Sequence, residues 1–285
     1  MAARCGNVVP LIVQGRGTRL MRHNRAMWQA EVDDYVAHLR AAGQAASTVR
    51  LRQMHLARAL TWLDCPPFEV TTDRLTAYMA GHDWAPETRK SVRSSLCSFY
   101  GWAESTGRIP DDPARRLPRV STPAGKPKPA PTDVVAAALS RAEPREALMV
   151  MLAAYAGLRR AEVAGLHADD ILEDTLRVKG KGGKVREVPM HPLLAEVLAG
   201  RTGFIFPGND HGHLSPDRVG RILSGLLGLG WTAHTLRHRF ATRAYAADRD
   251  LLSVQQLLGH ASVATTQRYT KLPDDALRRA VLSVA

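Results

Sequence analysis

The segment "HTLRHRF" at residues 234–240 places His234 and Arg237 three positions apart. On an α-helix, residues three positions apart lie on the same face, so an imidazole and a guanidinium would stand side by side. A guanidinium binds phosphate oxygens two at a time, and an imidazole exchanges protons near neutral pH. The ordinary alternative is that His234 only caps a helix. The interpretation of this segment therefore depends on residues elsewhere in the chain.

Four other residues of the same half of the chain stand at comparable positions. Arg159 lies in "AGLRRAEVAGL", just after an apolar segment, and Lys181 lies between two β-type runs. His260 follows a glycine at which a helix is expected to end, and Tyr269 comes nine residues later. Each has an ordinary alternative role: an ion pair of Arg159 with Glu162, a solvated turn lysine, a core histidine, or a tyrosine that anchors a terminal helix.

Together, these six side chains suit one reaction, the attack of a tyrosine on a phosphodiester. A phenol has a pKa of about 10, so its attack needs a path for the proton and neutralisation of the phosphate. Two arginines would stabilise the charge that builds up in the transition state, and a histidine would accept the phenolic proton. A lysine on a loop would protonate the leaving 5′ oxygen. We see no carboxylate cluster that would hold a divalent ion, and we expect neither a metal nor a cofactor.

Composition favours a nucleic-acid partner. The 285 residues include 39 Lys and Arg against 27 Asp and Glu, which gives a net charge of +12. Such a charge fits a polyanion, and the alternative is a basic protein from an arginine-rich proteome. A hydrophobic content of 45% indicates a globular core. The longest apolar segment, "ALMVMLAAYAGL", is too short to cross a bilayer, so we expect a cytoplasmic, nucleoid-associated protein with no membrane partner.

A proline-rich, basic stretch at residues 109–132 divides the chain. Its prolines are incompatible with a helix and favour an extended linker. Before it we expect an N-terminal extension (1–24) and a helical domain (25–108). After it we expect a second domain (133–272) and a C-terminal helix (273–285).

Hydrophobic periodicity predicts a mainly α fold with a small β-hairpin or sheet. Before the linker, apolar residues recur every three or four positions in three segments, the second of them capped by Ser47 or Thr48. After the linker, Leu176–Val178 and Val185–Val188 flank "KGKGGK" and predict a hairpin, and "FIFP" (204–207) predicts a further strand. The three helical stripes consist of Val32, Tyr35, Val36 and Leu39, then Val49, Leu56, Leu60 and Leu63, then Val92, Leu96, Phe99 and Ala103.

In this pattern the sequence resembles the tyrosine recombinases of the phage-integrase class, which include the Xer resolvases. The resemblance covers about residues 130–275 and is weaker over the helical domain before them. It implies the fold of the DNA breaking-rejoining enzymes, with two domains forming a clamp on DNA. The matching motifs are Gly157-Leu158-Arg159 with Glu162, Lys181 in a "GKG" turn with Val188-Pro189, His234 with Leu236-Arg237-His238, Leu258-Gly259-His260, and Tyr269.

The resemblance implies a site-specific DNA recombinase that works through a 3′-phosphotyrosyl intermediate and a Holliday junction. Tyr269 would be the nucleophile, Arg159 and Arg237 would bind the scissile phosphate, and Lys181 would be the general acid.

The two histidines of the set would handle protons and hydrogen bonds. His234 would act as general acid and base, and His260 would bind the phosphate or the attacking oxygen. Glu162 and His238 would support these groups from behind.

The implied partners are duplex DNA with a core site and three further copies of the chain. The tail at 273–285 would form a helix that docks onto a neighbouring protomer and links a homotetramer at synapsis; docking onto its own domain is the alternative. An accessory directionality factor would be a further partner. The basic residues that we predict as DNA contacts are Arg50, Arg52, Arg89, Lys90, Arg93, Arg115, Arg116, Lys126 and Lys128.

Several roles stay open at this point. The residues before the helical domain are too few for the arm-type domain of large integrases, so we expect a phage or mobile-element integrase that uses core sites alone. A Xer-like chromosome or plasmid resolvase is the alternative. A type IB topoisomerase shares the catalytic set, and a DNA-binding protein that has lost catalysis would share the fold. The "GLR" and "LGH" motifs favour a recombinase, and the intact set of six residues argues against a silent protein.

Overall fold

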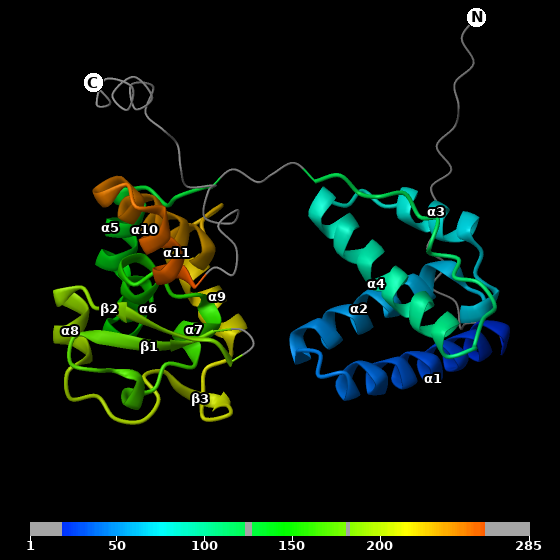
Figure 1. The fold of residues 1–285 in the computed structure, drawn as a ribbon, viewed down its shortest axis with the longest axis horizontal. Coiled ribbons are helices and arrows are strands. Elements are labelled where there is room, and N and C mark those ends of the chain that lie inside the picture. Colours follow the sequence, from blue (N-terminus) through cyan, green and yellow to red (C-terminus); the bar gives the residue numbers. More distant parts are fainter. Residues whose placement is uncertain (1–18, 123–126, 181–182, 260–285) are drawn as a thin grey trace, which may run out of the picture. The chain divides into compact units, whose positions relative to one another are not determined.

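A computed structural model describes residues 19–122, 127–180 and 183–259, with side chains from residue 23 onward. The chain forms two compact units, residues 1–125 and 126–285. Figure 1 shows the first unit as helices alone and the second as helices with a small sheet. In the described part of the chain, no helix has the length and apolar character needed to cross a membrane.

The first unit is built around an aromatic core. The rings of Trp28 and Phe99 stack with their centroids 5.6 Å apart, and Tyr35 meets Phe99 edge-on. The predicted apolar stripes all face this core, except that Leu60 is only partly buried. The helices are α1 (Arg19–Ala41), α2 (Ala46–Leu63), α3 (Thr72–Ala80) and α4 (Pro86–Ser105), with a 3-10 turn at Pro67–Glu69.

Two helix starts differ from the sequence-based expectation. α1 already begins at Arg19, so the boundary that we expected at residue 24 falls inside this helix. Asn24 is buried there and donates a hydrogen bond from its side chain to the carbonyl of Asp64. The prediction that Ser47 or Thr48 caps the second helix is wrong, because α2 starts one residue earlier and Ala45 precedes it without a side-chain cap.

Much of the proline-rich stretch packs onto the two units, its first part onto the first unit and its last part onto the second. Ile109, Ala114 and Leu117 are buried in the core of the first unit. On the other side of residues 123–126, Ala130 is buried in the core of the second unit, and its N–H donates to the carbonyl of Thr235. The prolines exclude a helix, but the apolar residues between them bury their side chains as helical residues would.

The second unit surrounds α6 (Pro144–Tyr155), whose Leu148, Met149 and Leu152 are fully buried. Helices on several sides cover α6 because its apolar residues face all round, as expected for a central helix. The other helices are α5 (Thr132–Arg141), α7 (Arg160–Ala164), α8 (Pro192–Leu198), α9 (Pro216–Leu227), α10 (Ala233–Asp248) and α11 (Leu251–Leu258), with a 3-10 turn at Ala168–Asp170.

The hairpin predicted in this unit is confirmed. β1 (Thr175–Lys179) and β2 (Val185–Pro189) pair antiparallel, with Lys179 opposite Val185. The strand predicted at 204–207 is wrong: Phe204 forms only an isolated bridge with His167, and β3 starts where "FIFP" ends, at Pro207–Asp210.

Candidate active site

Arg159 stands in the turn between α6 and α7. Gly157 allows this turn because its φ is +65°, a value that favours glycine. Arg159 directly precedes α7, and its backbone N–H donates to Oε2 of Glu162 at 2.8 Å. Its Nη1 donates to Oε1 of the same carboxylate, also at 2.8 Å. The ordinary ion pair weighed for Arg159 is therefore present, and it fixes the position of this guanidinium.

Glu162 lies at the centre of three arginines. Its side chain is only 3% exposed, and Nη1 and Nη2 of Arg186, on β2, bind its two oxygens at 2.9 and 2.8 Å. Nη1 of Arg237 lies 3.8 Å from Oε2. A single carboxylate thus gathers guanidinium groups from α10, from β2 and from the start of α7.

The charge of Glu162 is stabilised where it stands. Burial alone would raise the pKa of this carboxyl, because it removes water from the charged form. The hydrogen bonds from Arg186 and from the backbone N–H of Arg159 outweigh that effect and hold the pKa of Glu162 below its ordinary value. The carboxylate is therefore ionised at neutral pH and adds a negative charge among the three cations.

Arg237 connects α10 to two distant turns. Its Nη1 donates to the carbonyl of Gly157 at 2.6 Å, and its Nη2 donates to the carbonyl of Leu258. Arg237 is 2% exposed, whereas the side chain of Arg159 is 41% exposed. Arg159 can therefore meet a ligand from solvent more openly than Arg237 does.

His234 lies at the start of α10. It is exposed in the first turn of α10, and its ring meets that of His238 edge-on with centroids 4.2 Å apart. It lines a cavity of about 690 Å³ together with Arg160 and Arg221. The predicted helix carries both His234 and Arg237, but Arg237 is buried whereas His234 is exposed.

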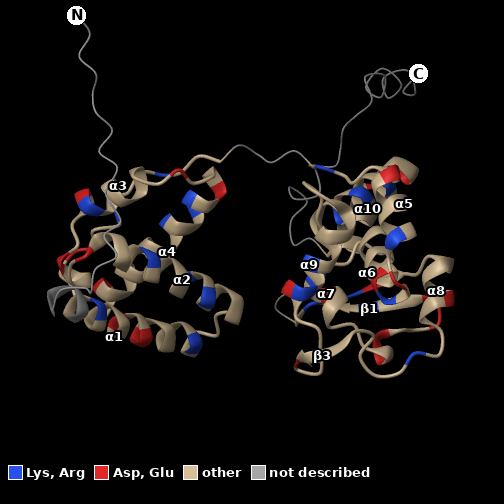
Figure 2. Ribbon diagram, turned by 180° about the vertical axis from the view of Figure 1, so that it is seen from behind, with Lys and Arg blue, Asp and Glu red and all other residues tan. Residues whose placement is uncertain are grey.

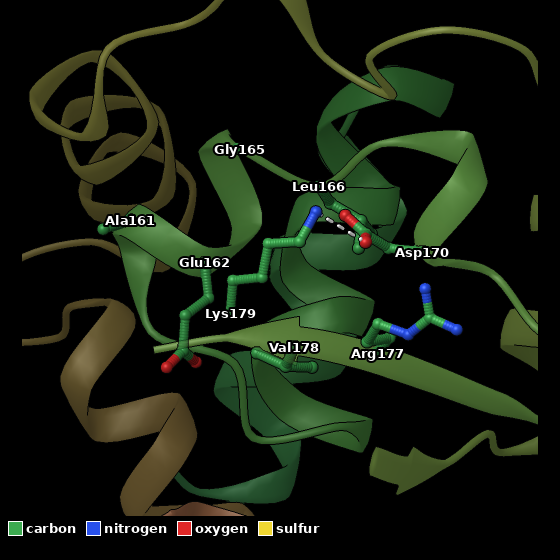
Figure 3. A pocket seen from close by; sticks show the side chains of 8 residues that line it. All are labelled: Ala161, Glu162, Gly165, Leu166, Asp170, Arg177, Val178 and Lys179. Carbon is green, nitrogen blue, oxygen red and sulfur yellow. Dashed lines mark ion pairs between the residues drawn. The ribbon is translucent and has the colours of Figure 1, made fainter. Parts of the chain in front are cut away.

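An ion pair holds the hairpin that carries Lys181 at the point where its loop begins. Figure 3 shows Lys179 reaching towards Asp170, and its Nζ lies 2.9 Å from Oδ1. Both residues line a cavity of about 140 Å³ whose wall also includes Glu162, the carboxylate of which turns away from this pair. Lys181 itself lies outside the described residues.

The helix predicted to end before His260 does end there. α11 stops at Leu258, and Gly259 adopts a left-handed conformation with φ +62°. His260 and Tyr269 lie outside the described residues, so their roles remain predictions. In the described part of the chain, no three His, Cys, Asp or Glu side chains are grouped as metal ligands.

Comparison with known proteins identifies the family. The phage integrase family matches residues 132–275. The chain belongs to this family. The tyrosine recombinase XerC of Methylobacterium sp. (strain 4-46) is 37% identical over 271 residues, which cover 81% of this chain and 83% of that protein. The XerC of Rhodospirillum centenum is 36% identical over 219 residues, 67% of this chain and 63% of that protein.

Solved structures agree with this assignment at the level of the fold. A lambda integrase dimer bound to a COC′ core site matches with a TM-score of 0.68 at 21% identity, over 93% of this chain and 85% of that one. The XerH recombinase bound to its difH substrate matches with a TM-score of 0.64 at 19% identity, over 92% and 93%. The chain has the tyrosine-recombinase fold, and it is a site-specific recombinase of the tyrosine type.

The residues predicted to contact DNA differ in whether their side chains are bound to other groups of the protein. Arg50 and Arg116 are exposed, and Figure 2 shows the Lys and Arg positions of the first unit along its helices. Arg93, by contrast, donates to the carbonyls of Leu117 and Pro118. Five more of the predicted residues have partners within their own unit, namely Arg52, Arg89, Lys90, Arg115 and Lys128, and Lys126 lies outside the described residues.

Arg186 is the residue of the site that the sequence analysis missed. Successive side chains of a strand point to opposite faces, so Arg186 shares a face with Val188, which is fully buried. Its partner across the hairpin, Val178, is buried as well. An arginine on the inward face of an amphipathic strand was the available indication, because such a charge needs a buried partner.

Proposed function

We propose that this recombinase cuts and rejoins duplex DNA at a core site through a covalent 3′-phosphotyrosyl bond to Tyr269. The observation that carries the proposal is the convergence of Arg159 and Arg237 on Glu162, although Arg237 and its acceptor Gly157 are 80 residues apart in the chain. Two guanidinium groups at one place suit a phosphodiester, whose two non-bridging oxygens both gain charge in the transition state.

The reaction conserves the phosphodiester. The phenolic oxygen of Tyr269 forms a bond to phosphorus and the bond to the 5′ oxygen breaks, while Lys181 supplies the proton that this leaving oxygen takes up. His234 accepts the phenolic proton, and His260 hydrogen-bonds the phosphate. A 5′-hydroxyl of the partner duplex then attacks the phosphotyrosine in the reverse sense, so no ATP is consumed.

The DNA partner and the assembly complete the proposal. Two solved relatives are bound to a core site and to a difH substrate, which supports a duplex core site as the partner of this chain. The helical first unit contributes phosphate contacts, with the exposed Arg50 and Arg116 as candidates. The tail at 273–285 links four protomers at synapsis.

A nicked suicide duplex that carries the core site tests this function. The wild type should accumulate a covalent protein–DNA adduct, and Tyr269→Phe should form none while it still binds the duplex. An unchanged adduct in Tyr269→Phe would mean that another residue is the nucleophile.

Of the two biological roles, resolution has the better support from the relatives. The XerC protein of Methylobacterium aligns over 81% of this chain, which extends the match beyond the catalytic unit. We therefore propose a Xer-like resolvase, with integration of a phage or mobile element as the second candidate. A resolvase should resolve a plasmid with two directly repeated core sites into two circles. An integrase would instead join two separate circles, and it would reverse this reaction only in the presence of a directionality factor.

A further inference from the structure

We infer that Arg186 is a positioning residue for DNA cleavage, which fastens the end of α11 to the carboxylate that orients Arg159. The inference rests on the proposed function and deepens it. The chain runs from α11 directly to His260 and then to Tyr269, so the place where α11 ends is the starting point of the segment that carries the nucleophile.

One guanidinium makes both connections. Nη1 and Nη2 of Arg186 bind the two oxygens of Glu162, and its Nε donates to the carbonyl of Leu257 at 2.8 Å. A planar guanidinium can make these bonds together because its donors are held in one fork. An ammonium group keeps the charge but lacks the fork, so lysine at this position cannot reproduce the three bonds.

The turn at the end of α11 lies directly on Arg186. A Cβ on Gly259 would stand 3.0 Å from Cδ of Arg186, so the backbone of this turn passes close to the arginine stem. Arg237 adds a second bond to this turn through the carbonyl of Leu258. The end of α11 is therefore fixed from two sides, by β2 and by α10.

Burial makes the pair stiff. The side chains of Arg186 and Glu162 are 11% and 3% exposed, so little water competes for their hydrogen bonds. Buried ion pairs often stabilise a fold no better than apolar residues of the same size, because removing two charges from water costs free energy. A role in geometry explains the pair better than a role in stability alone.

The experiment compares Arg186→Lys and Arg186→Met with Arg177→Met, the whole chain being used throughout. Arg177 is a matched control, since it lies on the same hairpin and its side chain makes no hydrogen bond or ion pair within the described residues. Single-turnover cleavage of the nicked suicide duplex is measured at saturating DNA. We expect Arg186→Lys to cleave about 10- to 100-fold more slowly, with a Kd for DNA within about twofold of wild type. Arg177→Met should cleave within about twofold of wild type.

The pH profile separates positioning from a general loss of structure. The charged groups around Glu162 are Arg159, Arg186 and Arg237, and the wall of the cavity of Figure 3 also contains Lys179, Asp170 and Arg177. Arg186→Met removes the strongest of the hydrogen bonds that lower the pKa of Glu162, so this carboxyl takes up a proton at higher pH. The acidic limb of the cleavage profile should move to higher pH, and by more than the loss of folded enzyme over the same pH range, followed by circular dichroism, accounts for.

Hydrogen exchange gives a readout that needs no cleavage. Without DNA, Arg186→Lys should exchange the amides of residues 257–259 faster than wild type, and those of 175–179 at the same rate. Cleavage by Arg186→Lys within twofold of wild type, or unchanged exchange at 257–259, would overturn the inference. A wild type that forms no adduct would instead refute the proposed function, and exchange would then decide alone whether Arg186 holds α11.

Discussion

Gly157 lies so close to Phe240 that a Cβ on this glycine would stand 2.4 Å from Cδ1 of the phenyl ring. The glycine also has a positive φ, and its carbonyl accepts a hydrogen bond from Arg237. One residue thus combines a backbone conformation, a close contact and an acceptor, and it brings the turn before Arg159 against α10.

Gly157→Ala should therefore destabilise the second unit. The clash and the left-handed φ act together, and we expect a loss of about 1–3 kcal/mol in the free energy of unfolding. Gly225→Ala is the control, because this glycine lies in α9 with open space where a Cβ would stand. It should gain about 0.5–1 kcal/mol. Urea unfolding of both variants measures the difference, and equal changes would contradict it.

The buried and exposed ion pairs of the second unit should differ in their contribution to stability. Arg186→Met leaves a buried carboxylate without its two-pronged partner, which we expect to cost about 3–5 kcal/mol. Arg160 and Asp217 lie 3.3 Å apart, but their side chains are 56% and 80% exposed. Arg160→Met should cost less than about 1 kcal/mol. Chemical denaturation of the two variants gives the comparison, and a larger loss in Arg160→Met would be the contrary result.

Two buried tyrosines of the first unit should respond in opposite ways to loss of their hydroxyl. Tyr100 donates to the carbonyl of Pro67 at 3.0 Å, so Tyr100→Phe should cost about 1–3 kcal/mol by leaving that acceptor unsatisfied. Within the described residues the hydroxyl of Tyr78 has no hydrogen-bond partner. Tyr78→Phe should cost nothing and gain up to about 1 kcal/mol. Thermal unfolding measures both, and a substantial loss in Tyr78→Phe would reveal a partner.

The hydroxyl of Tyr78 should also lose its proton only at unusually high pH. Burial raises its pKa to about 12, although the nearby Arg58 acts in the opposite direction. Because the neutral phenol is favoured in the folded state, this contribution to stability is present below pH 10 and is lost as the pH rises towards 12. At pH 11, ultraviolet absorbance should therefore show that Tyr78→Phe removes one phenolate from the unfolded chain and almost none from the folded protein.

The stability that Glu162 contributes should depend on acid. Its folded-state pKa is lowered, so the contribution is fully present above the ordinary glutamate pKa of 4.5 and is lost as the pH falls below it. The gap in unfolding free energy between wild type and Glu162→Gln should stay constant from pH 6 to 8 and shrink below about 4.5. Urea titrations across this range measure the gap, and a gap that widens in acid would contradict the lowered pKa.

The hairpin and the helices could be predicted from the sequence better than the contacts between them. The hairpin was predicted because alternating apolar residues flank a glycine-rich turn, and the stripes around Phe99 followed from helical periodicity. Glu162 was correctly expected beside Arg159, three positions away. The bond from Arg186 to Leu257 joins residues 71 positions apart, and no local pattern encodes such a partner. The residue types of "FIFP" favour a strand, but Ile205 and Phe206 are buried in the core without a strand partner of their own among the described residues, and β3 begins only at Pro207.

The network around Glu162 draws all its members from one unit of the chain. Every bond described for Arg159, Arg186 and Arg237 joins residues beyond position 125, so this arrangement is built within the second unit. A chimaera in which another recombinase's helical unit replaces residues 1–125 should keep this arrangement intact. The two units can then be exchanged between relatives as separate modules.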